Sequence, residues 1–150
     1  MLEQVNRGLR QQQEALDNLR ARAGTTVTAA SVVSTVLGAA ALTRRHYPVP
    51  LIVFTVLALL AFAVALASSA YILWPYDWAW GISGDKLLVD YVEADPPADL
   101  DEMRRSLAFY IQRDMILNRR QLDRLYSWLR VAVASIALEV VTWSLALVLR

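Results

Sequence analysis

Three stretches of the sequence, each of about twenty residues, are apolar enough to cross a lipid bilayer, and they constrain the fold more than any other feature. Residues 23–43 and 51–74 hold no charged side chain, and residues 131–149 hold a single one, Glu139. A helix of about 20 apolar residues is long enough to cross a hydrocarbon core of about 30 Å. The sequence therefore predicts an all-α membrane protein with three transmembrane helices.

The composition supports a membrane protein and argues against several other classes. Hydrophobic residues make up 57% of the chain, which is too many for an ordinary soluble domain. The formal net charge of +1 gives no field that would recruit a nucleic acid polymer. The absence of cysteine removes disulfides and thiolate chemistry. The sequence also shows no glycine-rich phosphate loop, nucleophile–base pair or metal-ligand cluster, so we expect no enzyme, no cofactor and no metal.

The N-terminal segment, residues 1–22, is polar but periodic, which predicts a cytosolic amphipathic helix. Positions at alternating steps of three and four form a heptad seam, which consists of Leu2, Val5, Leu9, Gln12, Leu16, Leu19 and Ala23. Such a seam favours pairing with another helix, and the alternative is a helix that lies on the lipid surface. Gly8 lies off the seam and is expected to weaken the helix.

The first span, residues 23–43, is rich in small and hydroxyl residues, whereas the second, 51–74, is richer in leucine and valine. Four of the small residues recur at steps of three and four, and they are Thr28, Ser31, Thr35 and Gly38. This pattern predicts a face on which another helix packs closely. The alternative is that the hydroxyl groups bond to their own backbone. We expect the second span to face lipid.

The predicted linker, residues 75–99, passes from aromatic to acidic residues. Four tryptophans in and around it are predicted to anchor the chain at the membrane interface, and they are Trp74, Trp78, Trp80 and Trp128. The alternative for this aromatic run is a cage for a cation or a base. Residues 86–94 are expected to form a short helix that ends before Pro96. The acidic spacing fits no calcium-binding loop, so we expect these acids to cap the following helix.

The last third of the chain predicts one long helix, with residues 100–130 in the cytosol and residues 131–149 in the membrane. Its apolar residues form a single stripe at steps of three and four residues. Two polar residues interrupt this stripe, Asn118 in the first part and Glu139 in the second.

Positively charged residues indicate the orientation of the spans. Lysine and arginine number four before the first span, two between the first and second, eight between the second and third, and one at the end. Because cytosolic loops retain these residues, the N-terminus and residues 75–130 are predicted to be cytosolic. The N-terminal helix and the long helix then run parallel as a stalk, within one chain or between chains. Gln12 and Asn118 are candidates for fixing its register and copy number.

Glu139 is the strongest functional candidate, because an ionisable carboxyl group in a membrane span costs several kcal/mol if it faces lipid. Ser135 and Thr142 lie about one turn before and after it. Three spans are too few to enclose a wide aqueous path, so a ring of Glu139 residues from several copies could line a cation-conducting constriction. The alternative is that a protonated Glu139 bonds Ser31, Ser34 or Thr35 and holds the bundle together.

Four stretches of the chain resemble a group of bacterial membrane proteins. These stretches are residues 16–25 (LDNLRARAGT), 90–97 (DYVEADPP), 118–126 (NRRQLDRLY) and 138–143 (LEVVTW). Together they resemble small actinobacterial multi-spanning membrane proteins and, more distantly, Pycsar and SLATT-type transmembrane effectors of anti-phage defence. The resemblance implies an effector in the bacterial inner membrane that oligomerises and permeabilises the membrane when a nucleotide signal is present.

The sequence thus leads to two functional hypotheses. The first is an oligomeric inner-membrane channel or membrane-perturbing effector in which Glu139 lines or gates the path. The second is a non-conducting scaffold or accessory subunit that docks partners through its cytosolic helices. Expected partners are the lipid bilayer, further copies of the chain and an anionic regulator, such as a nucleotide, or anionic lipid. Candidate contacts for it are Arg104, Arg105, Arg119 and Arg120, unless these pair with nearby aspartates in solvent.

Overall fold

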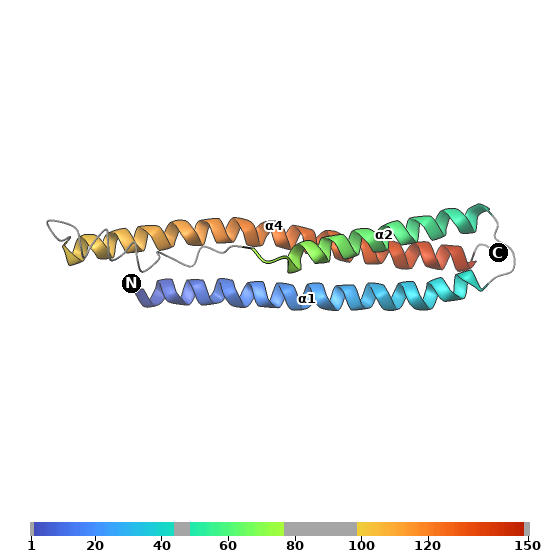
Figure 1. The fold of residues 1–150 in the computed structure, drawn as a ribbon, viewed down its shortest axis with the longest axis horizontal. Helices are drawn as coiled ribbons and strands as arrows, with labels where there is room; N and C mark the ends of the chain where they lie inside the picture. The colour runs from blue at the N-terminus through green and yellow to red at the C-terminus, as the bar shows by residue number, and fades with distance from the viewer. Residues whose placement is uncertain (1, 44–48, 77–98, 149–150) are drawn as a thin grey trace. The chain divides into compact units, whose positions relative to one another are not determined.

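The computed structural model describes residues 2–43, 49–76 and 99–148, and nearly all of them are helical (Figure 1). The helices are α1 (Leu2–Leu42), α2 (Val49–Leu73) and α4 (Leu100–Val148). All three are long and apolar enough to cross a membrane, which confirms the prediction of an all-α protein with three spans. The predicted short helix 86–94 and the linker tryptophans Trp78 and Trp80 lie outside the described residues.

α1 and α4 each continue from a polar segment into an apolar one without a break in the helix. Asp99 directly precedes α4, and its carbonyl oxygen accepts a hydrogen bond from the Met103 amide at 3.0 Å. Asp101 and Glu102 occupy its first turn, where negative charge is favourable because the helix dipole is positive there.

The chain forms two compact units, and their boundaries fall within α1 and α4. The first unit consists of Met1–Leu16 and Tyr76–Asp123, and the second, here called the membrane unit, consists of Asp17–Pro75 and Arg124–Arg150. The membrane unit contains all of α2 and the apolar segments of α1 and α4.

Within the membrane unit, α1 and α4 run parallel and α2 runs antiparallel to both. Ser34 and Gly38 of α1 contact Glu139 and Trp143 of α4 in the same order along the two helices. In contrast, Leu51 at the start of α2 packs in one cluster with Ala146 near the end of α4. The order of contacts along the three helices therefore fixes their directions.

Many of the residues that face the inside of the membrane unit are small, although Leu19, Leu51, Ile72, Leu125 and Trp143 are buried there as well. The buried small residues are Ala23, Ala30 and Ala41 of α1, Ala58, Ala61 and Ala65 of α2, and Ala132 and Ala146 of α4. The exposed aliphatic residues of α2 include Ile52, Val53, Val56, Leu59 and Leu60. This arrangement suits a lipid environment, because helix backbones can approach closely where side chains are small, while lipid tails solvate the larger ones.

The prediction that Thr28, Ser31 and Thr35 form the packing face of α1 is wrong within one chain. Thr28 and Thr35 are exposed, and all three hydroxyl groups donate to the backbone carbonyl four residues earlier, at 3.1, 2.9 and 2.7 Å. Of the predicted face only Gly38 is buried. Hydroxyl groups can always find a backbone acceptor within their own helix, so their spacing alone does not fix which side of the helix is packed.

In the first unit, α1 packs against α4 through longer side chains. The Gln12 side-chain amide donates to the Met115 carbonyl oxygen at 3.0 Å, and Leu16 and Leu122 are buried. Gln12 and Leu16 of the predicted seam thus lie on the side of α1 that packs against α4 in this unit. Gly8, which is off the heptad seam in the sequence, still lies close to α4, because a Cβ atom added at Gly8 would come within 2.6 Å of the terminal carbon of Met115.

Candidate functional site

The candidate site is centred on Glu139, in the apolar part of α4. Glu139 follows Arg130, an exposed residue of the same helix, by nine positions. At a rise of 1.5 Å per residue this separates them by about 13 Å along the helix axis, close to half of a hydrocarbon core of about 30 Å. Glu139 therefore lies near the middle of the span that α4 forms.

The carboxyl group of Glu139 is sheltered by its own chain. The residue is 0% exposed, and its Oε1 accepts a hydrogen bond from the hydroxyl group of Ser34 on α1. One chain therefore buries this acid completely, in line with the alternative that Glu139 bonds a hydroxyl group of the first span. This burial agrees with the prediction from the sequence that Glu139 faces protein or water, because a carboxyl group that faces lipid is costly in free energy.

Ser34 is the first-span residue that reaches Glu139, whereas Ser31 and Thr35 do not. Ser31 donates to Val27 and Thr35 donates to Ser31, both within α1. Sequence reasoning named Ser34 only as one of three possible partners. Its position relative to Ala30 and Gly38, four residues on either side and both buried, could have singled it out.

Ser135 and Thr142 lie on the buried side of α4 near Glu139. The Thr142 hydroxyl group lies 2.6 Å from the Leu138 carbonyl oxygen and 3.0 Å from that of Glu139, so its polar group is turned to its own helix. Ser135 is 9% exposed and occupies the preceding turn. The two residues thus flank the carboxyl group on the packed face of α4.

Trp143 and Gly38 complete the site. The sequence places Trp143 one turn after Glu139 and Gly38 on a small-residue face of the first span, but it does not predict their contact. Trp143 is 1% exposed, and its ring atoms Cζ2 and Cη2 would lie 3.3 and 3.5 Å from a Cβ atom at Gly38. Glycine thus allows the indole ring to approach α1 one turn beyond the Ser34 contact. The spacing of the residues could have revealed this pair. Ser34 and Gly38 are four residues apart on α1, and Glu139 and Trp143 are four residues apart on α4.

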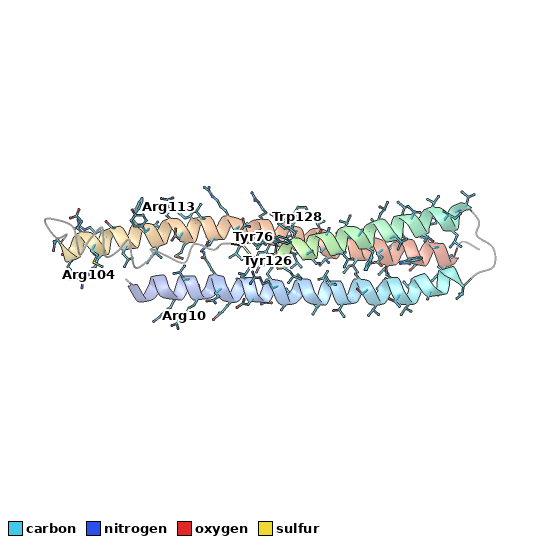
Figure 2. All side chains as sticks on the ribbon, viewed as in Figure 1. Arg10, Tyr76, Arg104, Arg113, Tyr126 and Trp128 are labelled. Atoms are coloured by element: carbon cyan, nitrogen blue, oxygen red, sulfur yellow. The ribbon has the colours of Figure 1, made fainter. Side chains whose placement is uncertain are left out.

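Two of the four predicted interface tryptophans lie in the described part of the chain. Trp74 is exposed just beyond the end of α2. Trp128, labelled in Figure 2, is partly exposed, and its ring lies against that of Tyr71 with centroids 5.2 Å apart and planes tilted by 46°. The contact lies at the end of α2 that leads to Trp74. Such positions suit rings that lie at the depth of the lipid headgroups.

Gln12 and Asn118 lie at the packed side of the first unit. Gln12 bonds α4 as described, while its Oε1 is buried without a hydrogen-bond partner among the described residues. Asn118 is buried on α4, three residues beyond Met115. Gln12 of the N-terminal seam and Asn118 of the apolar stripe on α4 therefore both lie where they can influence the register of α1 on α4.

The structure groups the predicted arginines differently from the sequence. Arg104 and Arg105 line a shallow groove with Phe109 and Gln112, and Arg113 lines the adjoining one. Figure 2 labels Arg104 and Arg113. Arg104 also lies 3.5 Å from Asp101. Arg119 and Arg120 are exposed further along α4 and line neither groove. The sequence analysis did not single out Phe109, which lies between Arg105 and Arg113 along α4 and is 71% exposed.

The fold and this site define a class of protein, a three-span membrane protein with an acid enclosed at the centre of its bundle. The family model for the Pycsar effector protein domain, PycTM, matches residues 4–150, so the chain belongs to this family. The resemblance seen in the sequence is thereby confirmed. The protein is a membrane-located transmembrane effector of anti-phage defence. No curated protein and no solved structure matches the chain significantly.

Proposed function

We propose that this effector permeabilises the bacterial inner membrane and that Glu139 controls the opening of the path. The observation that carries the proposal is the enclosed carboxyl group, 0% exposed and held by Ser34 across the contact between α1 and α4. Burying such a group in a membrane is costly, so a protein that only docks partners would gain stability from an apolar residue in its place. The acid is therefore better explained by a role in ion movement.

The described conformation corresponds to a closed state in this proposal. Alanine side chains and Trp143 fill the interior of the membrane unit, which supports a path between chains and not through one chain. A shift of α4 against α1 would break the Ser34–Glu139 hydrogen bond and leave the carboxyl group in need of water. Homo-oligomerisation would supply a shared, water-filled lumen in which several Glu139 carboxylates select for cations.

The activating partner is proposed to be an anion that binds the first unit. Arg105, Phe109 and Arg113 occupy successive turns of α4, so an aromatic ring lies between two guanidinium groups. Arginine forms strong hydrogen bonds with phosphate, and the ring can stack on a planar group, so a nucleotide or a lipid phosphate matches this chemistry. We further propose that this unit faces the cytoplasm, as the distribution of arginine indicates, and that the protein is not an enzyme.

Flux measurements on purified protein in liposomes test the proposal. Ser34→Ala removes the bond that holds Glu139, so the basal cation leak should rise roughly tenfold, the factor that matches the about 1–1.5 kcal/mol of one hydrogen bond. Ser31→Ala is the matched control, because that hydroxyl group bonds only its own helix, and it should leave the leak unchanged.

Replacing the acid itself tests its role in selectivity. Glu139→Gln keeps the size of the side chain and removes its charge, so the preference for cations over anions should fall. Ser144→Ala is a control on the exposed side of the same helix, where the hydroxyl group bonds Val140. A selectivity that ignores Glu139→Gln would contradict the role of Glu139. No flux at any protein density, in all variants, would favour the non-conducting scaffold.

A further inference from the structure

Two polar atoms on neighbouring turns of α4 lack a hydrogen-bond partner within the described ranges 2–43, 49–76 and 99–148. They are Oε2 of Glu139 and Nε1 of Trp143, in side chains that are 0% and 1% exposed. A buried polar atom without a partner is unfavourable, and the centre of a membrane offers no bulk solvent to compensate it. Native proteins commonly satisfy such atoms with an internal water molecule.

Both atoms lie on the side of α4 that faces α1. The other oxygen of the Glu139 carboxyl group accepts from Ser34, and the Cζ2 edge of the Trp143 ring lies against Gly38. In an indole ring Nε1 is next to that edge, so its N–H group points toward the same side. Glu139 and Trp143 are four residues apart and are therefore neighbours on one face of α4, a spacing at which one water molecule can hydrogen-bond to polar groups of both side chains.

The chemistry of the two atoms selects the ligand. An indole N–H group can only donate a hydrogen bond, and a carboxylate oxygen accepts one. A metal cation would be repelled by the N–H group, and an anion would be repelled by the carboxylate. A water molecule can accept from the first atom and donate to the second.

The geometry points to one internal water molecule that bridges Nε1 of Trp143 and Oε2 of Glu139. Both oxygens of the carboxyl group are then hydrogen-bonded, one to Ser34 and one to water. Glu139 is thereby accommodated in the closed chain without a bound cation. This inference rests on the buried atoms alone and holds whether or not the protein conducts ions.

NMR spectroscopy of the full chain in nanodiscs of deuterated lipid, with the tryptophans labelled with ¹⁵N, tests the inference. Trp143→Phe assigns the Nε1–H resonance of Trp143. In the wild-type chain this resonance should show a cross-peak to water. The cross-peak should persist in Glu139→Gln, which keeps an acceptor oxygen, and should disappear in Glu139→Leu, which has none. The partly exposed Trp128 serves as the positive control for water contact.

A control substitution on α2 makes the test specific. Ser69→Ala removes another buried hydroxyl group without a hydrogen-bond partner among the described residues, on α2, and should leave the Trp143 cross-peak unchanged. A wild-type Nε1–H resonance without a water cross-peak overturns the inference, and so does a cross-peak that disappears in Ser69→Ala. If Glu139→Leu does not fold, the wild-type, Glu139→Gln and Ser69→Ala spectra still decide the question. Because no flux is measured, failure here is distinct from failure of the permeation proposal.

Discussion

α1 packs against α4 in both units of the molecule, but the residues at the two contacts differ in kind. In the first unit the contact uses long side chains, with Met115 against Gly8 and Gln12 bonded to the opposite backbone. In the apolar part of the membrane unit the α1 residues at the contact are small: Ser34 donates a hydrogen bond to Glu139, and Gly38 lies against the ring of Trp143. The same two helices thus follow two different packing rules.

The difference follows from the solvent that each unit is built for. Where water surrounds a helix pair, large apolar side chains turn inward because their removal from water is favourable. Where lipid surrounds it, this driving force is absent, and close packing of small residues with a few polar contacts holds the helices together. Side-chain size therefore marks the packed face in the membrane unit better than polarity does.

The largest expected effect comes from removing the aromatic side chain that fills the membrane unit. Trp143→Ala should lower the free energy of unfolding by about 3 kcal/mol, because a fully buried ring is lost and a cavity is left beside Gly38. Thermal or denaturant unfolding in detergent micelles, followed by circular dichroism, measures the loss. Trp128→Ala is the control, and its smaller effect follows from partial exposure. Equal losses for the two variants would contradict the placement of Trp143 at the centre of the packing.

A pair of identical substitutions compares the two units directly. Gly38→Ala places a Cβ atom 3.3 Å from the rigid indole ring of Trp143, an overpacking that costs about 2 kcal/mol. This cost exceeds the gain in helix propensity of about 1 kcal/mol, so the variant should be destabilised by about 1 kcal/mol. Gly8→Ala places one near the terminal carbon of Met115, the end of a flexible side chain, which can move. The gain in helix propensity, about 1 kcal/mol, should then offset or exceed the cost of this shift.

The measurement for this pair is the change in unfolding free energy of each variant under the same conditions. Opposite or clearly unequal signs are expected. Equal losses at both positions would show that Met115 is held as firmly as Trp143, and the contrast between long flexible and small rigid contacts would fail.

The sequence predicted those parts of the fold that depend on length and composition. Three apolar stretches and an unbroken stripe on the last third are enough to define α1, α2 and α4, and the cost of an acid in lipid is enough to place Glu139 inside. The four stretches that resembled known effectors pointed to the family that the PycTM match confirms.

The predictions that were wrong or incomplete depend on how one helix is rotated about its axis relative to another. Small residues occur on more than one face of α1, and only the partner helices decide that Ser34 is packed and Thr35 is exposed. The role of Gly8 was missed for the same reason, because it depends on where Met115 lies. The sequence left Ser31, Ser34 and Thr35 open as partners of Glu139, because the choice depends on which of them lies at the level of Glu139 on α4.

A smaller effect is expected from the polar residue at the contact in the first unit. Gln12→Leu should change the unfolding free energy by less than about 1 kcal/mol or stabilise the chain slightly. It removes a buried Oε1 without a partner among the described residues and a hydrogen bond to a carbonyl within α4. Gln12→Ala, which also leaves empty space, should destabilise the chain more. If Leu and Ala are equally destabilising, the hydrogen bond to Met115 contributes more than the packing of the contact.

The smallest effect is expected at Thr35, which the sequence places on a packing face of α1 but which is exposed in the single chain. Thr35→Val keeps the shape of an exposed side chain whose hydroxyl group bonds Ser31 in its own helix, so the unfolding free energy should change by less than about 0.5 kcal/mol. The neighbouring change Ser34→Ala removes the partner of Glu139 and should cost more. Unfolding in micelles and flux in liposomes, measured for both variants, make the comparison. If Thr35→Val impaired flux while leaving stability intact, the exposed side of α1 would be a contact between copies, and the rule that small residues mark a packed face would hold for the oligomer as well as for the single chain.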